Sequence, residues 1–488
     1  EHTKSLQFDK LHPQVLFNYL GEMSSNEQSK SIFDFSQTGS GKSISNDFEL
    51  RHPIEINAVT VDNKINFDIA YNPEIYSQQQ IQLFFENYKT ALSEIAEHCI
   101  SRNYPEKTPS DYTIKNMSIS DYDILKDKYC GNIEDIYPLT SLQEGMLYHY
   151  IADNAQSDMY FEQTTLTINE VLNLEKIEYA FNKIISRHKA LRVRIAYNGL
   201  DAPKQVVLNN NYLNINYNNA KNETDIKQFI ENYKVKDRTT KFNLENDLLL
   251  RVSVIETGVS QYVMILSFHH LIIDGWCNAI IFNEYQKIMA GKEEVLEPAI
   301  DYKLYIDWLQ NRDYIAAEEF WREYLDGYDT PTKIGFIYDE TKDNIFAEDS
   351  LELGEEETKK MMQFTSFNNI TVNTLLNTAW GIVLAKYNFT SDAVFGTVQS
   401  GRPPEIKGIE KMMGLCINTV PVRIRINKNE SNIELLRRIQ KESILLQENG
   451  YLKLSRINFL SSLKNELFNH IIVFENYPFE INETSERE

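Results

Sequence analysis

The chain has 488 residues, of which 42% are hydrophobic and 25% charged, so we expect a folded polypeptide of about two or three domains. No stretch reaches the roughly 18 apolar residues that a membrane helix needs, and the first residues lack a secretory pattern, which favours the cytoplasm and no membrane partner. The formal charge of -22 is spread as alternating acidic residues and lysines, which argues against a nucleic-acid partner. Cys99, Cys130, Cys277 and Cys416 are too widely spaced to indicate a disulfide framework or a zinc site.

The first hundred residues predict a hairpin followed by a helix. Residues 54–61 and 65–71 are strand-like and are joined by Asp62-Asn63-Lys64. Apolar residues then recur at helical spacing from 77 to 100. Residues 101–133 lose this periodicity and collect prolines and charges, so we expect a linker there.

From Tyr137 onward helices and strands alternate, with helices near 142–151 and 174–188 and a strand at 191–196. No Gly-rich phosphate loop accompanies them, so the class is α/β or α+β and not a nucleotide binder. Residues 261–268 are apolar on both faces, as in a central strand covered on both sides. A helix is expected from Trp276. The turn between this strand and this helix therefore holds two histidines.

His269 and His270, at the end of that strand, are the most distinctive chemical feature of the sequence. Burying imidazole nitrogens is costly unless they are hydrogen-bonded or used. Asp274 lies on the same turn, where one histidine can act as a base while an arginine holds the carboxylate. Gly275 allows a sharp backbone and can offer its N–H to a developing oxyanion. A structural histidine pair and a metal site are the alternatives, although no second cluster supplies a third metal ligand at the usual spacing.

The segment His269–Trp276 resembles the HHxxxDG signature shared by condensation, epimerization and chloramphenicol-acetyltransferase-like enzymes. Five further segments are similar, in the same order, to motifs of the condensation domains of nonribosomal peptide synthetases: Tyr137–His149, Ser186–Arg192, Tyr305–Trp308, Gly396–Pro403 and Met413–Arg423. The sequence departs from the RHExLR motif at Lys189, where the family has Glu.

This resemblance implies an α/β (α+β) fold like that of chloramphenicol acetyltransferase, a two-lobed, V-shaped pseudo-dimer with a tunnel between its lobes. The lobes would be residues 134–308 and residues 309–488, the second being incomplete at its C-terminal end. Family members receive substrates on the phosphopantetheine of carrier proteins. We therefore expect no directly bound cofactor, no metal, and as partners the peptidyl carrier domains upstream and downstream and the adenylation domain of the same module.

The resemblance also implies the roles of the site residues. His270 is the functional histidine and acts on the acceptor amine, with His269 beside it. Asp274 is structural, and Arg192 is the expected salt-bridge partner, with a solvated arginine at a strand end as the alternative. Three further residues, Trp276, Asn418 and Arg402, would line the substrate channel, with packing or a structural hydrogen bond as the alternative for each.

Residues 1–100 resemble part of a different type of domain. Val15–Gly21 looks like the FNYLG motif late in epimerization domains, so residues 1–100 would be the C-terminal remnant of such a domain. Gln14–Tyr19 also resembles Ile471–Tyr477 with one insertion, so these two segments would be the same structural point in two successive related domains. Because the second lobe is expected to be incomplete, residues 1–100 either remain unpaired or fold back and complete it. A condensation domain after an epimerization domain usually joins a D-configured donor to an L-configured acceptor. Epimerization, ester-forming condensation and a degenerate, non-catalytic recruitment module are the alternative functions.

Overall fold

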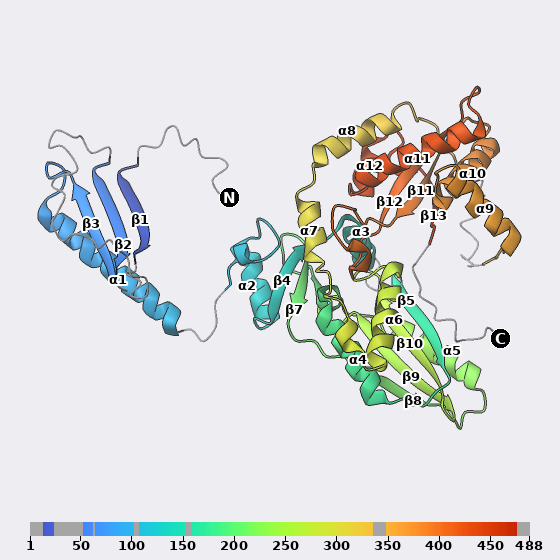
Figure 1. The fold of residues 1–488 in the computed structure, drawn as a ribbon, viewed down its shortest axis with the longest axis horizontal. Helices are drawn as coiled ribbons and strands as arrows, with labels where there is room; N and C mark the ends of the chain where they lie inside the picture. The colour runs from blue at the N-terminus through green and yellow to red at the C-terminus, as the bar shows by residue number, and fades with distance from the viewer. Residues whose placement is uncertain are drawn as a thin grey trace, which may run out of the picture. The chain divides into compact units, whose positions relative to one another are not determined.

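The computed structural model describes residues 13–23, 52–61, 64–101, 107–152, 159–334 and 348–475. The chain divides into two compact units, residues 1–106 and 107–488. Each unit is described by itself below, with the element labels of Figure 1.

The first unit is a three-stranded sheet with one long helix. Its elements are β1 Val15–Met23, β2 Ile54–Val61, β3 Lys64–Tyr71 and α1 Gln78–Ser101. β1 pairs in parallel with β2, and β2 pairs antiparallel with β3. The predicted hairpin and the predicted helix are both confirmed. Among the described residues of this unit, the buried apolar side chains are Ile54, Ile56, Ala58 and Ile81.

The prediction of a linker at residues 101–133 is wrong from residue 107 onward, the part of this stretch that the structure describes. This stretch contains a 3-10 turn, η2 Pro109–Asp111, and a helix, α2 Ile119–Lys128, whose first turn is capped by Ser118. Leu125 of α2 is fully buried and packs in a small cluster with Val206. The helix is short, so its apolar residues cannot establish a helical period, and the charges between them resemble a linker.

The first lobe of the second unit has two sheets. A four-stranded sheet has the order β5-β10-β9-β8, and a three-stranded sheet has the order β4-β7-β6. The strands are β4 Ile133–Pro138, β5 Phe161–Ile168, β6 Val193–Ala196, β7 Lys204–Leu208, β8 Asn216–Asn219, β9 Leu250–Gly258 and β10 Gln261–His269. The helices are α3 Ser141–Ala152, α4 Leu174–Arg187, α5 Ile226–Thr239, α6 Gly275–Met289 and α7 Lys303–Gln310, with 3-10 turns η3 Lys189–Arg192 and η4 Glu293–Val295.

Helices cover both faces of the four-stranded sheet (Figure 1). Phe181 of α4 and Ile281 of α6 share a core with Met264 of β10, whereas Phe229 of α5 packs with Ile265, which points to the opposite face of β10. β10 is hydrogen-bonded to β5 on one side and to β9 on the other. This confirms the prediction of a central, doubly covered strand that leads to the two histidines.

The two predicted helices near 142–151 and 174–188 are confirmed. They correspond to α3 and α4, whose ends lie within about two residues of the expected ones. The strand expected at 191–196 begins only at Val193. The 3-10 turn η3 occupies the residues before it.

The second lobe is built on the sheet β12-β11-β13. Its elements are α8 Tyr314–Leu325, α9 Glu355–Phe367, α10 Val372–Tyr387, β11 Asp392–Gln399, η5 Ile409–Lys411, β12 Asn418–Arg425, α11 Asn432–Glu448, α12 Leu454–Leu460, η6 Lys464–Glu466 and β13 Ile471–Ile472. Helices surround this sheet (Figure 1), and Trp321 of α8 is fully buried in the core that they form with Phe395 of β11.

The chain crosses from the second lobe back to the first between β11 and β12. Ile406, Met412, Leu415 and Cys416 lie in the core of the first lobe, although they come after the expected lobe boundary at residues 308 and 309. The two lobes are therefore not two uninterrupted stretches of sequence. This crossing segment brings side chains of the second half of the chain to the histidine turn.

Candidate active site

The histidine turn joins β10 to α6 and is tied to neighbouring strands by its backbone. The His269 N–H donates to the carbonyl of Leu249 at 3.1 Å, and the His270 N–H donates to the carbonyl of Tyr160 at 2.8 Å. Within the turn the Ile272 N–H donates to the carbonyl of His269. The positions of both imidazoles are therefore set by the strands of the first lobe.

His269 is buried, with 4% of its surface exposed, and lies among the rings of Tyr150, Tyr160 and Phe242. Its Nδ1 accepts a hydrogen bond from the Leu271 N–H at 3.2 Å. Burial, with a contribution from the neighbouring His270, lowers the pKa of His269 to about 3. A neutral ring that accepts a bond from the turn supports the backbone and is unsuited to exchange protons near neutral pH.

His270 is half-buried, and its hydrogen bonding assigns its tautomer. Nδ1 lies 2.7 Å from the carbonyl oxygen of Ile273. A carbonyl can only accept, so Nδ1 carries the hydrogen, and the neutral ring has its lone pair on Nε2. This nitrogen can accept a hydrogen bond or a proton from a substrate amine.

Asp274 is fully buried and holds the end of the turn. Both of its carboxylate oxygens accept from Nη2 of Arg402, at 3.0 and 3.2 Å. One oxygen also accepts from the Cys277 thiol at 3.2 Å, and the other from the Cys416 N–H at 3.1 Å. Burial raises the pKa of the Cys416 thiol to about 12 and that of the Cys277 thiol well above its usual value, so both thiols stay protonated. Asp274 is thus a structural anchor between α6 and the crossing segment.

The predicted pairing of Arg192 with Asp274 is wrong. Arg192 ends η3, and its Nη1 donates to the carboxylate of Glu134 and to the carbonyl of Leu208 at 2.7 Å. The partner of Asp274 is Arg402, for which the family resemblance implied a place along the substrate channel.

Trp276 and Gly275 begin helix α6. The indole N–H of Trp276 donates to the carbonyl of Glu410 at 2.7 Å, and the guanidinium of Arg402 lies 5.5 Å from its ring. These contacts favour the packing alternative for Trp276. Gly275, as the first residue of the helix, has its N–H in the first turn, where backbone donors have no partner within the helix. Its role toward an oxyanion stays a prediction.

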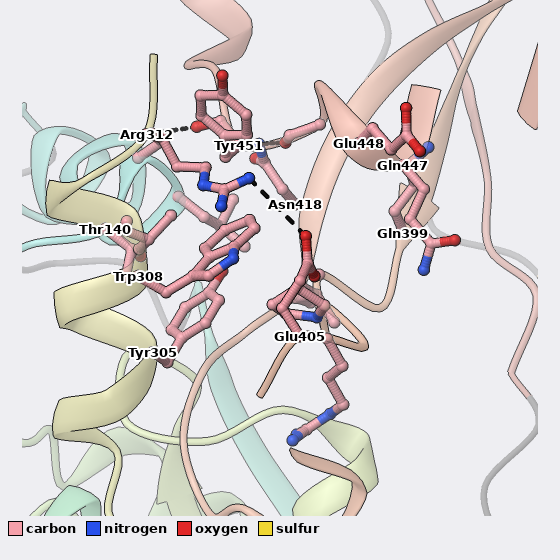
Figure 2. Close-up of a pocket in the computed structure, with 18 of the residues that line it drawn as sticks. Thr140, Tyr305, Trp308, Arg312, Gln399, Glu405, Asn418, Gln447, Glu448 and Tyr451 are labelled. Carbon is pink, nitrogen blue, oxygen red and sulfur yellow. Dashed lines mark hydrogen bonds and ion pairs between the residues drawn. The ribbon is translucent and has the colours of Figure 1, made fainter. Parts of the chain in front are cut away.

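A cavity of about 340 Å³ lies between side chains of the two lobes (Figure 2). Arg402 and Asn418 are among the residues that line it, and their role in a substrate channel stays a prediction. Asn418 also donates to the carbonyl of Gly450 at 2.6 Å, so it is a structural residue as well. His270 is not among the residues that line this cavity. Arg402 connects the two places because it lines the cavity and binds Asp274 of the turn.

Sequence reasoning missed one wall of this cavity. Tyr305, Trp308 and Arg312 lie at spacings of three and four residues on one face of α7 and its continuation, and all three line the cavity. That spacing was visible in the sequence, but a polar and aromatic stripe on a short helix gives no sign that it faces a space.

The described ranges hold neither a metal cluster nor a membrane helix. Within them, no three His, Cys, Asp or Glu side chains are placed so that they could hold a metal ion. No helix in the same ranges has the length and hydropathy to cross a membrane.

The family comparison covers nearly the whole chain. The family described as Condensation domain matches residues 2–117 and 133–488. The chain is 37% identical to bacitracin synthase 3 of Bacillus licheniformis over 95% of its own length, and 33% identical to bacitracin synthase 1 of the same organism over 98%. It spans 7% of the first of these proteins and 9% of the second.

Solved structures are similar in fold. A four-domain nonribosomal peptide synthetase bound to AMP and glycine matches with a TM-score of 0.59 at 17% identity, covering 71% of this chain and 27% of that one. The first condensation domain of the calcium-dependent antibiotic synthetase, in complex with a substrate analogue, matches with a TM-score of 0.55 at 16% identity, covering 70% of this chain and 80% of that one. The expected α/β fold of the chloramphenicol-acetyltransferase type is thereby confirmed. By its sequence, its fold and its histidine turn, the chain belongs to the condensation domain family of nonribosomal peptide synthetases.

Proposed function

We propose that this chain forms a peptide bond between two carrier-bound substrates. The amine of the acceptor attacks the thioester carbonyl of the donor, a C–N bond replaces the C–S bond, and the proton that the amine loses ends on the released thiol. The reaction needs no oxidant and no metal. The chain itself has to bring the two groups together and guide one proton.

The observation that carries this proposal is the hydrogen bond from Nδ1 of His270 to the carbonyl of Ile273. It directs the lone pair of Nε2 to an incoming amine while the buried Asp274–Arg402 pair fixes the turn. A free amine with a pKa near 8 is already partly deprotonated at neutral pH. A hydrogen bond to Nε2 of His270 that positions this amine therefore contributes to the rate even without full proton transfer. The N–H of Gly275 is our candidate for contacting the developing oxyanion.

The partners and the stereochemistry follow from the proposal. Substrates would arrive on the phosphopantetheine of peptidyl carrier domains upstream and downstream, and the adenylation domain of the same module would load the acceptor in the cytoplasm. Because residues 1–100 resemble the end of an epimerization domain, we propose a donor that is D-configured at its reacting residue and an L-configured acceptor.

The test is a condensation assay with two loaded carriers, each donor being offered in its D and its L form. His270→Ala should lower the rate by at least about 100-fold, the range in which a positioned acid or base contributes. His98→Ala, which changes an exposed histidine of α1, is the matched control and should retain the wild-type rate. Unchanged product formation by His270→Ala would remove this residue from the mechanism. A preference of the wild type for the L donor would overturn only the stereochemical part.

A further inference from the structure

A buried glutamine of the segment Tyr137–His149 reaches the histidine turn. Gln143 lies in the first turn of α3, and only 1% of its surface is exposed. Its Nε2 donates a hydrogen bond to the carbonyl of Leu271 at 2.7 Å, although 128 residues separate the two. Leu271 follows His270 directly, so this bond connects α3 to the turn that carries the reacting histidine.

The orientation of the Gln143 amide is fixed by its other partners. The second hydrogen of Nε2 is donated to Oε1 of Gln205 at 2.9 Å, and Oε1 of Gln143 accepts from the Thr140 N–H at 2.8 Å. The reverse orientation would place the amide oxygen against the carbonyl of Leu271 and the NH2 group against the N–H of Thr140. Gln143 is therefore the donor to the turn.

The bond from Gln143 holds one edge of a peptide group whose other edge is also held. The carbonyl of Leu271 and the N–H of Ile272 belong to the same planar group. While the carbonyl accepts from Gln143, the N–H donates to the carbonyl of His269 at 3.2 Å. The Leu271 N–H, in the preceding peptide group, donates to Nδ1 of His269. The backbone that follows His270 is thus pinned to α3 and to the end of β10.

This pinned backbone leads to the atom that sets the tautomer of His270. The carbonyl of Ile273 comes one residue after the pinned peptide group and accepts from Nδ1 of His270 at 2.7 Å. An imidazole exchanges between its two neutral tautomers unless a partner of one nitrogen selects one of them. If the Leu271–Ile272 peptide group turned, the Ile273 oxygen would move with it. The lone pair on Nε2 would then no longer be secured.

We propose that Gln143 is a positioning residue for the condensation reaction. By holding the carbonyl of Leu271, it keeps the carbonyl of Ile273 beside Nδ1 of His270 and so keeps the lone pair on Nε2. It acts through the turn and touches neither substrate nor the reacting atoms. The inference rests on the proposed function in assigning His270 to the reaction, whereas the effect on the tautomer is independent of any substrate.

Nuclear magnetic resonance of the ring nitrogens tests the effect directly, in the full chain with nitrogen-15-labelled histidine at pH 8. The His270 signals are those that are absent from His270→Ala. In the wild type they should show the hydrogen on Nδ1. Gln143→Met has a similar length but cannot donate, so its His270 signals should shift toward a mixture of the two tautomers.

The carrier assay gives a second measurement on the same variant. Gln143→Met should lower kcat by up to about tenfold, the factor that one net hydrogen bond gives. The KM for the loaded carriers should stay at the wild-type value, because the change lies inside the turn. If Gln143→Met does not fold, Gln143→Asn replaces it. This variant keeps the amide but is one methylene shorter, so it should lose the contact with Leu271 and show the same shift.

The matched control is Gln205→Met. Gln205 is as buried as Gln143, at 1% exposed, and its loss removes two hydrogen bonds, from Gln143 and to the carbonyl of Pro138. The bond to Leu271 is left intact. This variant should therefore lose stability in urea as Gln143→Met does, but keep the wild-type tautomer and kcat.

Two results would overturn the inference. One is a wild-type tautomer in the Gln143 variant, and the other is an equal tautomer shift in Gln205→Met, which would reduce the role of Gln143 to general stability. The tautomer measurement needs no substrate. A protein that shows the expected shift on substitution but whose wild type forms no product would therefore contradict the proposed function alone.

Discussion

The arginine that holds Asp274 is the residue whose removal should cost the most stability at the site. Arg402→Ala leaves a carboxylate in the core without its cation, which typically costs about 3–5 kcal/mol. The matched variant Arg192→Ala leaves Glu134 with Lys189 as its cation, and the Glu134 side chain is 29% exposed and can be hydrated, so the loss of stability should be clearly smaller. Urea denaturation of both variants measures the difference. Equal losses would show that the ion pair does not anchor the turn.

The sequence could not identify this arginine. Arg402 is 128 residues away from Asp274, and both it and Arg192 lie in motifs of the family. Which of two distant arginines reaches a carboxylate depends on how the chain crosses between the lobes, and local patterns do not contain that information. The two histidines, by contrast, were correctly predicted to lie in a turn, because the strand before them and the helix after them each have a clear apolar pattern.

His269 should make the stability of the fold depend on pH. Its pKa in the folded chain is about 3, below the ordinary 6.5, so only the unfolded chain takes up this proton as the pH falls below about 6.5. The stabilisation is complete above that pH and is lost toward pH 3, by about 1.4 kcal/mol per pH unit for one proton. His269→Gln cannot take up the proton. Its free energy of unfolding, measured with urea between pH 7.5 and 4.5, should fall less steeply than that of the wild type; parallel curves would contradict the assignment.

At the scale of elements, the loop after β11 depends on close backbone packing at Gly401. A Cβ there would lie 1.7 Å from the carbonyl oxygen of Cys416, and the residue has a φ of +60°. Gly291 has a similar φ of +69° but open space around it. Both alanine variants strain the left-handed backbone, so Gly401→Ala should lower the melting temperature and the condensation rate well beyond Gly291→Ala. Similar melting temperatures would mean that the loop relaxes around the new methyl group.

Elements with a clear period were predictable, and elements fixed by tertiary packing were not. The strand β10 and the helix α1 have long, regular apolar patterns, and both were found with nearly correct ends. The helix α2 was taken for a linker because its ten residues carry only a few apolar side chains, which gain their burial from β7. The two-residue strand β13 is defined by its pairing with β11 and has no pattern of its own.

At the scale of the whole chain, the two units have unequal cores. Among its described residues the first unit buries few apolar side chains, whereas Val15, Phe17 and Leu20 of β1 are 46–55% exposed. Such a small core supports little stability, and an open strand edge with apolar side chains favours association. Whether residues 1–100 remain unpaired or complete the second lobe is not tested, and their origin from an epimerization domain stays a prediction.

Hydrogen exchange in the full chain can test this completion. If Phe17 packs on the second lobe, Phe17→Ser should speed exchange of the backbone amides of β11 and β12, because the sheet loses a side chain that covers it. Ile100→Ser, which alters a side chain 83% exposed on α1, is the control and should leave these amides at their wild-type rates. If exchange in both strands is the same in Phe17→Ser as in the wild type, residues 1–100 do not complete this lobe.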